Sequence, residues 1–115
     1  MFKSQYTLEQ RFLESQRIIS KYPDKVPIIC EKCSEQSGFY QDIDKKRYLV
    51  PCDYTFAQFM YLIRQRLRLR PEEALFLIVR DSIPPSATQM GVAYEMYKDI
   101  DGFLYIQYAK ENTFG

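Results

Sequence analysis

The chain has 115 residues, a formal net charge of +1 and no histidine, and 46% of its residues are apolar. This composition is typical of a folded domain, and the length supports one domain. The near-zero net charge gives no general case for nucleic-acid binding. No apolar run approaches the length of about 18 residues that a membrane span needs. Residues 1–5 do not resemble a signal peptide, so we expect a soluble protein to which any membrane attachment must be added.

The cysteines, which number three, are Cys30, Cys33 and Cys52. An odd number without a secretion signal predicts reduced thiols in the cytosol. The Cys30-x-x-Cys33 spacing raises a thiol oxidoreductase or a zinc site as an alternative. However, an offset of three along a strand points the side chains to opposite faces, and no histidine or second cysteine pair completes a zinc site. We therefore favour neither a thiol oxidoreductase nor a zinc site, and we predict no metal and no cofactor.

The first helix is expected over residues 6–21, with Thr7 as its N-cap and Gln10 at the matching capping-box position. Arg11 and Glu14 are placed on its outer side. The helix should end before Pro23, because a proline disfavours helical backbone in the preceding residue. A stripe at helical spacing consists of Leu8, Phe12, Ser15, Ile19 and Tyr22.

The next element is a strand over residues 26–31. Alternation places Val26, Ile28 and Cys30 on the core face and leaves Ile29 on the other face. An aliphatic side chain there must be covered by something, and the first helix is the candidate cover. A slot between helix and strand would result. Residues 34–44 are polar and are predicted to form a loop.

Residues 45–51 (KKRYLVP) form a short strand in which three cations lead into apolar residues. One interpretation is a plain edge strand, whose lysines repel other strands. The alternative is an edge that binds an extended acidic peptide by strand addition, since it combines backbone groups, positive charge and apolar surface.

The remaining elements follow from capping and turn signals. Thr55 and Gln58 fit a capping box at the start of a helix that extends to Leu67. Thr88 could cap a short helix that ends at Tyr94 or Tyr97. Strands are predicted over residues 75–79 and 103–108.

The predicted order of helix, two strands, helix, strand, short helix and strand indicates an α+β fold. A hairpin crossed by a helix, with two further strands, is the ubiquitin-like β-grasp with a four-stranded mixed sheet, here with an extra N-terminal helical segment. We divide the chain into a helical extension (1–24), the β-grasp core (25–109) and a flexible C-terminal tail (110–115).

Several blocks of the sequence resemble the GABARAP-type autophagy modifiers, which are ubiquitin-like proteins conjugated to a membrane lipid. The blocks are KYPDKVPII (21–29), DKKRYLVP (44–51), QFxxLIR (58–64), IPP (83–85), MG (90–91), FLYI (103–106) and the final Gly115. They occur in order over nearly the whole chain from about residue 8.

This resemblance implies two pockets beside the edge strand for an aromatic-x-x-aliphatic peptide with acidic neighbours. The aromatic pocket would consist of Glu14, Ile18, Pro27, Ile29, Arg47, Leu49 and Phe103. The aliphatic pocket would consist of Tyr48, Val50, Pro51, Tyr54, Phe59 and Leu62. Lys45, Lys46 and Arg66 would meet acidic groups of the peptide. Tyr54 stands where the family usually has an aliphatic residue, so we expect a shallower pocket that prefers valine or isoleucine to leucine.

The resemblance also implies that Gly115 is joined to phosphatidylethanolamine. Activating and conjugating enzymes would perform the transfer, after a cysteine protease removes any extension, so the protein would be their substrate and not itself an enzyme. The protein would be cytoplasmic, and would lie on the autophagosomal membrane when lipidated. There it would recruit cargo receptors and autophagy machinery. The alternative function is a non-conjugated trafficking or cytoskeletal adaptor that uses only the peptide groove.

Overall fold

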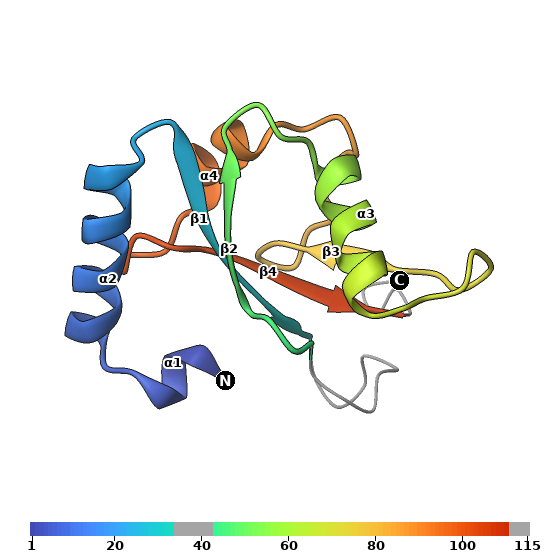
Figure 1. Cartoon of the computed structure of the whole chain (residues 1–115), viewed down its shortest axis with the longest axis horizontal. Coiled ribbons are helices and arrows are strands. Elements are labelled where there is room, and N and C mark those ends of the chain that lie inside the picture. The colour runs from blue at the N-terminus through green and yellow to red at the C-terminus, as the bar shows by residue number, and fades with distance from the viewer. Residues whose placement is uncertain (34–42, 111–115) are drawn as a thin grey trace.

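The computed structural model describes residues 1–33 and 43–110. The predicted loop over residues 34–44 therefore lies mostly outside the described residues, and so does the end of the predicted tail. In chain order the elements are α1 (Phe2–Gln5), α2 (Leu8–Lys21), β1 (Lys25–Lys32), β2 (Arg47–Pro51), α3 (Phe56–Arg66), β3 (Phe76–Ile78), α4 (Met90–Tyr97) and β4 (Leu104–Ala109) (Figure 1).

The strands form one four-stranded sheet in the order β2-β1-β4-β3. β1 pairs antiparallel with β2 and parallel with β4, and β3 pairs antiparallel with β4. The predicted α+β, ubiquitin-like fold with a mixed sheet is confirmed. Because β2 is an edge strand, one side of its backbone has no neighbouring strand within the described part of the chain.

The main core lies on the sheet face that α3 and α4 cover. Val26, Ile28 and Cys30 point into it, as the alternation predicted. α3 contributes Phe56, Phe59 and Ile63, and α4 contributes Met90 and Ala93. Apolar burial on this face contributes roughly 1.5–3 kcal/mol for each large side chain, so it is the main source of stability.

A smaller apolar cluster lies on the opposite face of the sheet, where α1 and α2 pack (Figure 1). Its buried members are Phe2, Ile29 and Phe103, with Ile18 and Tyr105 partly buried against them. The prediction that Ile29 stands apart from the main core is confirmed. The sequence predicted that α2 covers Ile29, but it did not predict α1, whose Phe2 also packs there.

Both capping boxes are present. The side chain of Thr7 accepts from the Gln10 N–H, and that of Thr55 accepts from the Gln58 N–H, with the glutamines bonding back in each case. The prediction for Thr88 was wrong. α4 has Gln89 as its N-cap and no side-chain capping bond.

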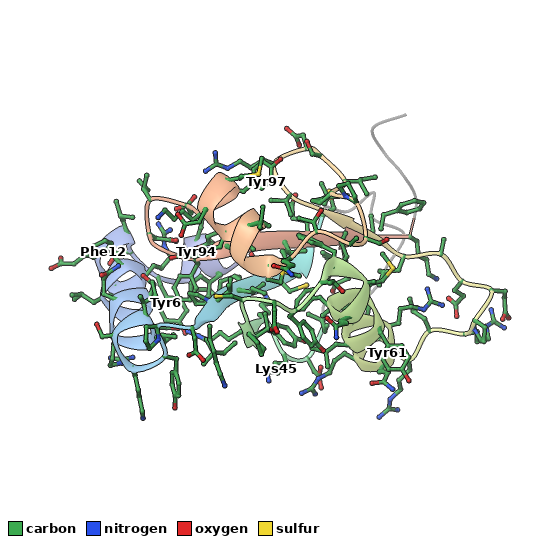
Figure 2. The ribbon with its side chains drawn as sticks, turned by 90° about the horizontal axis from the view of Figure 1, so that it is seen from above. Tyr6, Phe12, Lys45, Tyr61, Tyr94 and Tyr97 are labelled. Atoms are coloured by element: carbon green, nitrogen blue, oxygen red, sulfur yellow. The ribbon has the colours of Figure 1, made fainter. Side chains whose placement is uncertain are left out.

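The stripe predicted for the first helix is also partly wrong. Leu8 and Phe12 are 45% and 44% exposed, and Ser15 is the buried residue of α2. Phe12 is labelled in Figure 2. Arg11, predicted on the outer side, instead lies 2.6 Å from the carboxylate of Asp101. Thus α2 contacts this face of the sheet through Ser15, the Arg11 ion pair and Ile18, and not through Leu8 or Phe12.

Close approach of α2 depends on the turn at Asp101 and Gly102. Ser15 Oγ donates to the Asp101 carbonyl at 2.5 Å. Gly102 has a φ of +88°, and a Cβ at this position would collide with the Ser15 hydroxyl. Glycine is therefore required here both by its backbone conformation and by the space available.

Asp101 is fully buried and fully paired. Its carboxylate accepts from the Arg11 guanidinium at 2.6 Å, the Tyr105 hydroxyl at 2.5 Å and the Phe103 N–H at 2.9 Å. A carboxylate can be buried without a large energetic cost only when it is ion-paired and its oxygens accept hydrogen bonds, as here. The network attaches α2 to the start of β4.

We predict that Arg11→Ala lowers the free energy of unfolding by about 3–5 kcal/mol, because it leaves the buried Asp101 charge uncompensated. Urea denaturation would measure the change. Arg17→Ala is the matched control, since Arg17 is an exposed arginine of the same helix. A loss of equal size in the control would contradict the buried ion pair as the cause.

Candidate functional site

The edge strand β2 presents different side chains to the two faces of the sheet. Tyr48 and Val50 are buried in the main core, whereas Arg47 and Leu49 lie on the face that α1 and α2 occupy. A chain that pairs with the free edge of β2 would therefore have one packed layer on each side of it. This arrangement is the geometric basis of the candidate groove.

The structure brings the predicted aromatic-pocket residues together on the face below α2. In the β1–β2 register, Pro27 is opposite Leu49 and Ile29 is opposite Arg47. Ile18 of α2 packs on the cluster that contains Ile29 and Phe103, and Glu14 is ion-paired with Arg47. Pro27, Ile29 and Phe103 are buried, Glu14, Ile18 and Leu49 are partly buried, and Arg47 is exposed.

Phe2 is a member of this cluster that the sequence interpretation missed. It is 1% exposed, and its ring packs edge-on against Phe103 with 5.4 Å between ring centroids. Its backbone N–H donates to Glu31 Oε2 at 2.8 Å. Two features of the sequence could have indicated this contact. Phe2 is an aromatic residue in a largely polar segment, and Ile29 was predicted to lie outside the main core.

Arg47 lies on the outer side of the same group of residues. Its Nε and one terminal nitrogen donate to the Glu14 carboxylate at 2.8 and 3.2 Å. The guanidinium carbon also lies 4.7 Å from the Phe2 ring centroid and 5.2 Å from that of Tyr6, within the range of cation–π attraction. The hydrogen bonds to Glu14 raise the pKa of Arg47 further above its usual value.

The predicted aliphatic-pocket residues lie where β2 meets α3. Tyr48 and Phe59 are buried with their rings edge to face, 5.4 Å apart between centroids. Tyr54 and Leu62 are partly buried against the main core, and Pro51 is exposed at the end of β2. Val50 is buried beside them. The accessible surface of this region therefore comes mainly from Pro51, Tyr54 and Leu62.

The predicted charge contacts already have partners within the chain. Lys46 Nζ lies 3.4 Å from Glu31 Oε2, and an Arg66 nitrogen lies 3.4 Å from Asp44 Oδ2. Lys45 is labelled in Figure 2. Its Nζ lies over the Tyr48 ring, 5.0 Å from the ring centroid. An acidic peptide would therefore replace partners of these cations, and would not meet bare charges.

Cys30, Cys33 and Cys52 are free thiols. Burial raises the pKa of the Cys30 thiol, which disfavours the thiolate needed for thiol chemistry. Within residues 1–33 and 43–110, no cluster of three or more histidine, cysteine or carboxylate side chains could hold a metal ion. The thiol oxidoreductase alternative thus receives no support from the structure.

No helix in the described part of the chain has the length and apolar character needed to cross a membrane. Gly115, the predicted conjugation residue, lies outside the described residues.

The sheet order and the crossing helix define a ubiquitin-like protein, and comparisons with known proteins narrow this class. The family described as "Autophagy protein Atg8 ubiquitin like" matches residues 10–115. Autophagy-related protein 8 of Schizosaccharomyces pombe is 51% identical over 99% of this chain and 93% of its own length. Autophagy-related protein 8 of Saccharomyces cerevisiae (strain YJM789) is 50% identical over 99% and 96%. A crystal structure of Trypanosoma brucei ATG8 superposes with a TM-score of 0.88, at 40% identity, and covers 99% of this chain and 97% of that one.

The chain belongs to the Atg8 family of autophagy-related ubiquitin-like proteins. The family resemblance drawn from the sequence blocks is thereby confirmed.

One polar atom at the candidate site lacks a partner. Among the described residues, the Tyr48 hydroxyl is the buried side-chain oxygen or nitrogen without a hydrogen bond. We predict that Tyr48→Phe leaves the free energy of unfolding unchanged or raises it by about 1 kcal/mol, since an unsatisfied group is removed and the ring contact with Phe59 is kept. Urea denaturation of the two proteins would measure this. A clear loss of stability would show that the hydroxyl is satisfied in solution.

Proposed function

We propose that this protein is a modifier that is conjugated through Gly115 to phosphatidylethanolamine on autophagosomal membranes. There, β2 recruits cargo receptors and autophagy machinery that carry aromatic-x-x-aliphatic motifs. Residues 1–24 serve as a helical extension, 25–109 as the core and 110–115 as the conjugation tail. The protein is a substrate of its conjugating enzymes and not itself a catalyst.

The observation that carries the peptide-binding proposal is the pair of packed layers on either side of the free edge of β2. Successive side chains of a strand alternate between faces, so residues three positions apart point to opposite faces. In an aromatic-x-x-aliphatic peptide added to this edge, one anchor would face Leu49 and Ile18 and the other would face Leu62 and Tyr54. The spacing of the motif thus matches the arrangement of the edge.

A rough energy estimate favours a transient complex. Two buried anchors contribute roughly 1.5–3 kcal/mol each, and strand hydrogen bonds contribute about 0.5–1.5 kcal/mol each. Ordering a flexible peptide offsets a good part of this. A dissociation constant on the order of micromolar, equivalent to about −8 kcal/mol, is expected.

The conjugation proposal rests on family membership and on the terminal glycine. The Gly115 carboxylate would attack ATP and release pyrophosphate to give an acyl-adenylate, from which a cysteine of the activating enzyme displaces AMP. After transfer to a cysteine of the conjugating enzyme, the lipid amine would displace that thiol and leave an amide. Glycine suits these steps because it has no Cβ to obstruct a narrow site. A processing cysteine protease would act first on any chain with an extension.

The second candidate function is a non-conjugated trafficking or cytoskeletal adaptor. An adaptor would use the same groove but would not need Gly115.

We predict that the wild-type chain gains the mass of one phospholipid when it is incubated with activating and conjugating enzymes, ATP and phosphatidylethanolamine liposomes. Gly115→Ala should gain none, because the added methyl group obstructs the reacting carbonyl. Intact-mass spectrometry measures both outcomes. With enzymes shown to be active on another modifier, no gain in the wild type would leave the adaptor function.

We also predict that Tyr54 makes the aliphatic pocket selective for smaller anchors. In peptides that differ only at the last motif position, valine or isoleucine should bind more tightly than leucine, because the Tyr54 ring takes up part of the pocket. Isothermal titration calorimetry of the series would test this. Tyr54→Leu should remove the preference, and equal affinities across the series for the wild type would reject the prediction.

A further inference from the structure

The loop between α3 and β3 binds the last residue that the structure describes, Lys110. Glu73 of this loop is ion-paired with it, with 3.2 Å between Glu73 Oε2 and Lys110 Nζ. The preceding residue, Ala109, is buried at the end of β4 and pairs with Phe76 of β3. The loop and the end of β4 thus lie side by side (Figure 1). The ion pair extends the attachment of the C-terminal segment by one residue beyond the last strand pairing.

Glu73 is held in place by its own loop. Its carboxylate accepts from the Arg70 N–H at 2.9 Å and from Arg70 Nε at 3.2 Å. The Arg64 guanidinium of α3 donates to the Glu73 carbonyl at 2.7 Å and to the Arg70 carbonyl at 2.8 Å. Lys110 therefore binds a carboxylate that is already positioned. Since one partner is fixed in advance, forming the pair costs less side-chain entropy than joining two free side chains on a surface.

Both members of this pair are charged near neutral pH. The hydrogen bond from the Arg70 N–H and the pair with Lys110 lower the pKa of Glu73 to about 2. A carboxyl group with this pKa is ionised at pH 7, where a lysine side chain is protonated. The attraction is therefore present under the conditions in which the proposed conjugation would occur.

From these contacts we propose that Glu73 is a positioning residue for conjugation, because it holds Lys110 and so sets the point from which residues 111–115 reach the activating enzyme. This inference rests on the proposed conjugation of Gly115. Five residues span at most about 18 Å, so the terminal glycine must lie within that distance of Lys110. Without the pair, the start of this segment would be held only through Ala109. Capture by the enzyme would then order one residue more, at a larger cost in conformational entropy.

The test measures adenylation of Gly115 by a purified activating enzyme, as ATP–pyrophosphate exchange over a range of concentrations of this protein. Glu73→Gln keeps an oxygen for the Arg70 N–H and removes the charge that holds Lys110. Its KM should be about two- to fivefold higher with kcat unchanged, because the pair acts before the C-terminus is bound. Lys110→Gln should raise KM by the same factor. Lys110→Arg, which can keep the pair, should have the wild-type KM.

Glu72→Gln is the matched control. Glu72 is the neighbouring carboxylate and lies 3.4 Å from Arg70 Nε, whereas the pair with Lys110 belongs to Glu73. The control should have the wild-type KM. The double variant Glu73→Gln/Lys110→Gln should have the same KM as either single variant, since each removes the same interaction. Effects that multiply would show that the two residues act separately, for example by contacting the enzyme, and would overturn the positioning role.

Two further outcomes separate this inference from the proposed function. An unchanged KM in both Glu73→Gln and Lys110→Gln would overturn the inference. No exchange with the wild type, by an enzyme shown to be active on another modifier, would instead reject conjugation itself.

The ion pair can also be measured without any enzyme. An NMR titration of the Glu73 carboxyl group should show that Lys110→Gln raises its pKa from the wild-type value of about 2. An unchanged pKa would show that the pair is not formed in solution, and would overturn the inference.

Discussion

The contact between Asp101 and Arg11 decides where α2 lies, and the candidate groove depends on α2. Few residues of α2 are buried, so apolar packing alone gives the helix a weak hold on the sheet. The ion pair supplies a directional attachment, because Asp101 is also held by the Phe103 N–H and the Tyr105 hydroxyl at the start of β4. With Arg11 fixed, the positions of Glu14 and Ile18 above the sheet follow from the helical repeat, since residues three and four apart lie near one face.

The second constraint is the position of β2 at the edge of the sheet. A central strand would use both sides of its backbone for its own sheet, whereas one side of β2 has no neighbouring strand among the described residues. Tyr48 and Val50 of β2 point into the main core. Arg47 and Leu49 point to the opposite face of the sheet, where the smaller apolar cluster lies. The same alternation that stabilises the fold therefore places two chemically different surfaces next to one free edge.

Much of this arrangement could be predicted from local signals. The capping boxes at Thr7 and Thr55 and the alternation along β1 were sufficient to place those elements and to set Ile29 apart from the main core. The order of elements then indicated the ubiquitin-like sheet. These signals are local in sequence, so they are legible without the tertiary structure.

The failures have a common physical cause, which is tertiary contact between distant segments. The spacing of Leu8 and Phe12 suggested a buried stripe, but α2 approaches the sheet through Ser15 and Arg11 because Gly102 leaves room there. α1 was missed because its 4 residues show no helical period, and its position depends on residues far along the chain such as Glu31 and Asp99.

The cations around the groove add a final constraint on what can bind there. Arg47 is paired with Glu14, Lys46 with Glu31, and Arg66 with Asp44. A peptide carboxylate that takes over one of these cations must leave an internal carboxylate to be solvated again, so the exchange changes the net energy little. If peptides bind here as proposed, acidic residues in a partner would therefore affect which peptides are accepted more than how tightly they bind. In the proposed complex, affinity would then have to come from the apolar anchors, and not from the basic strand.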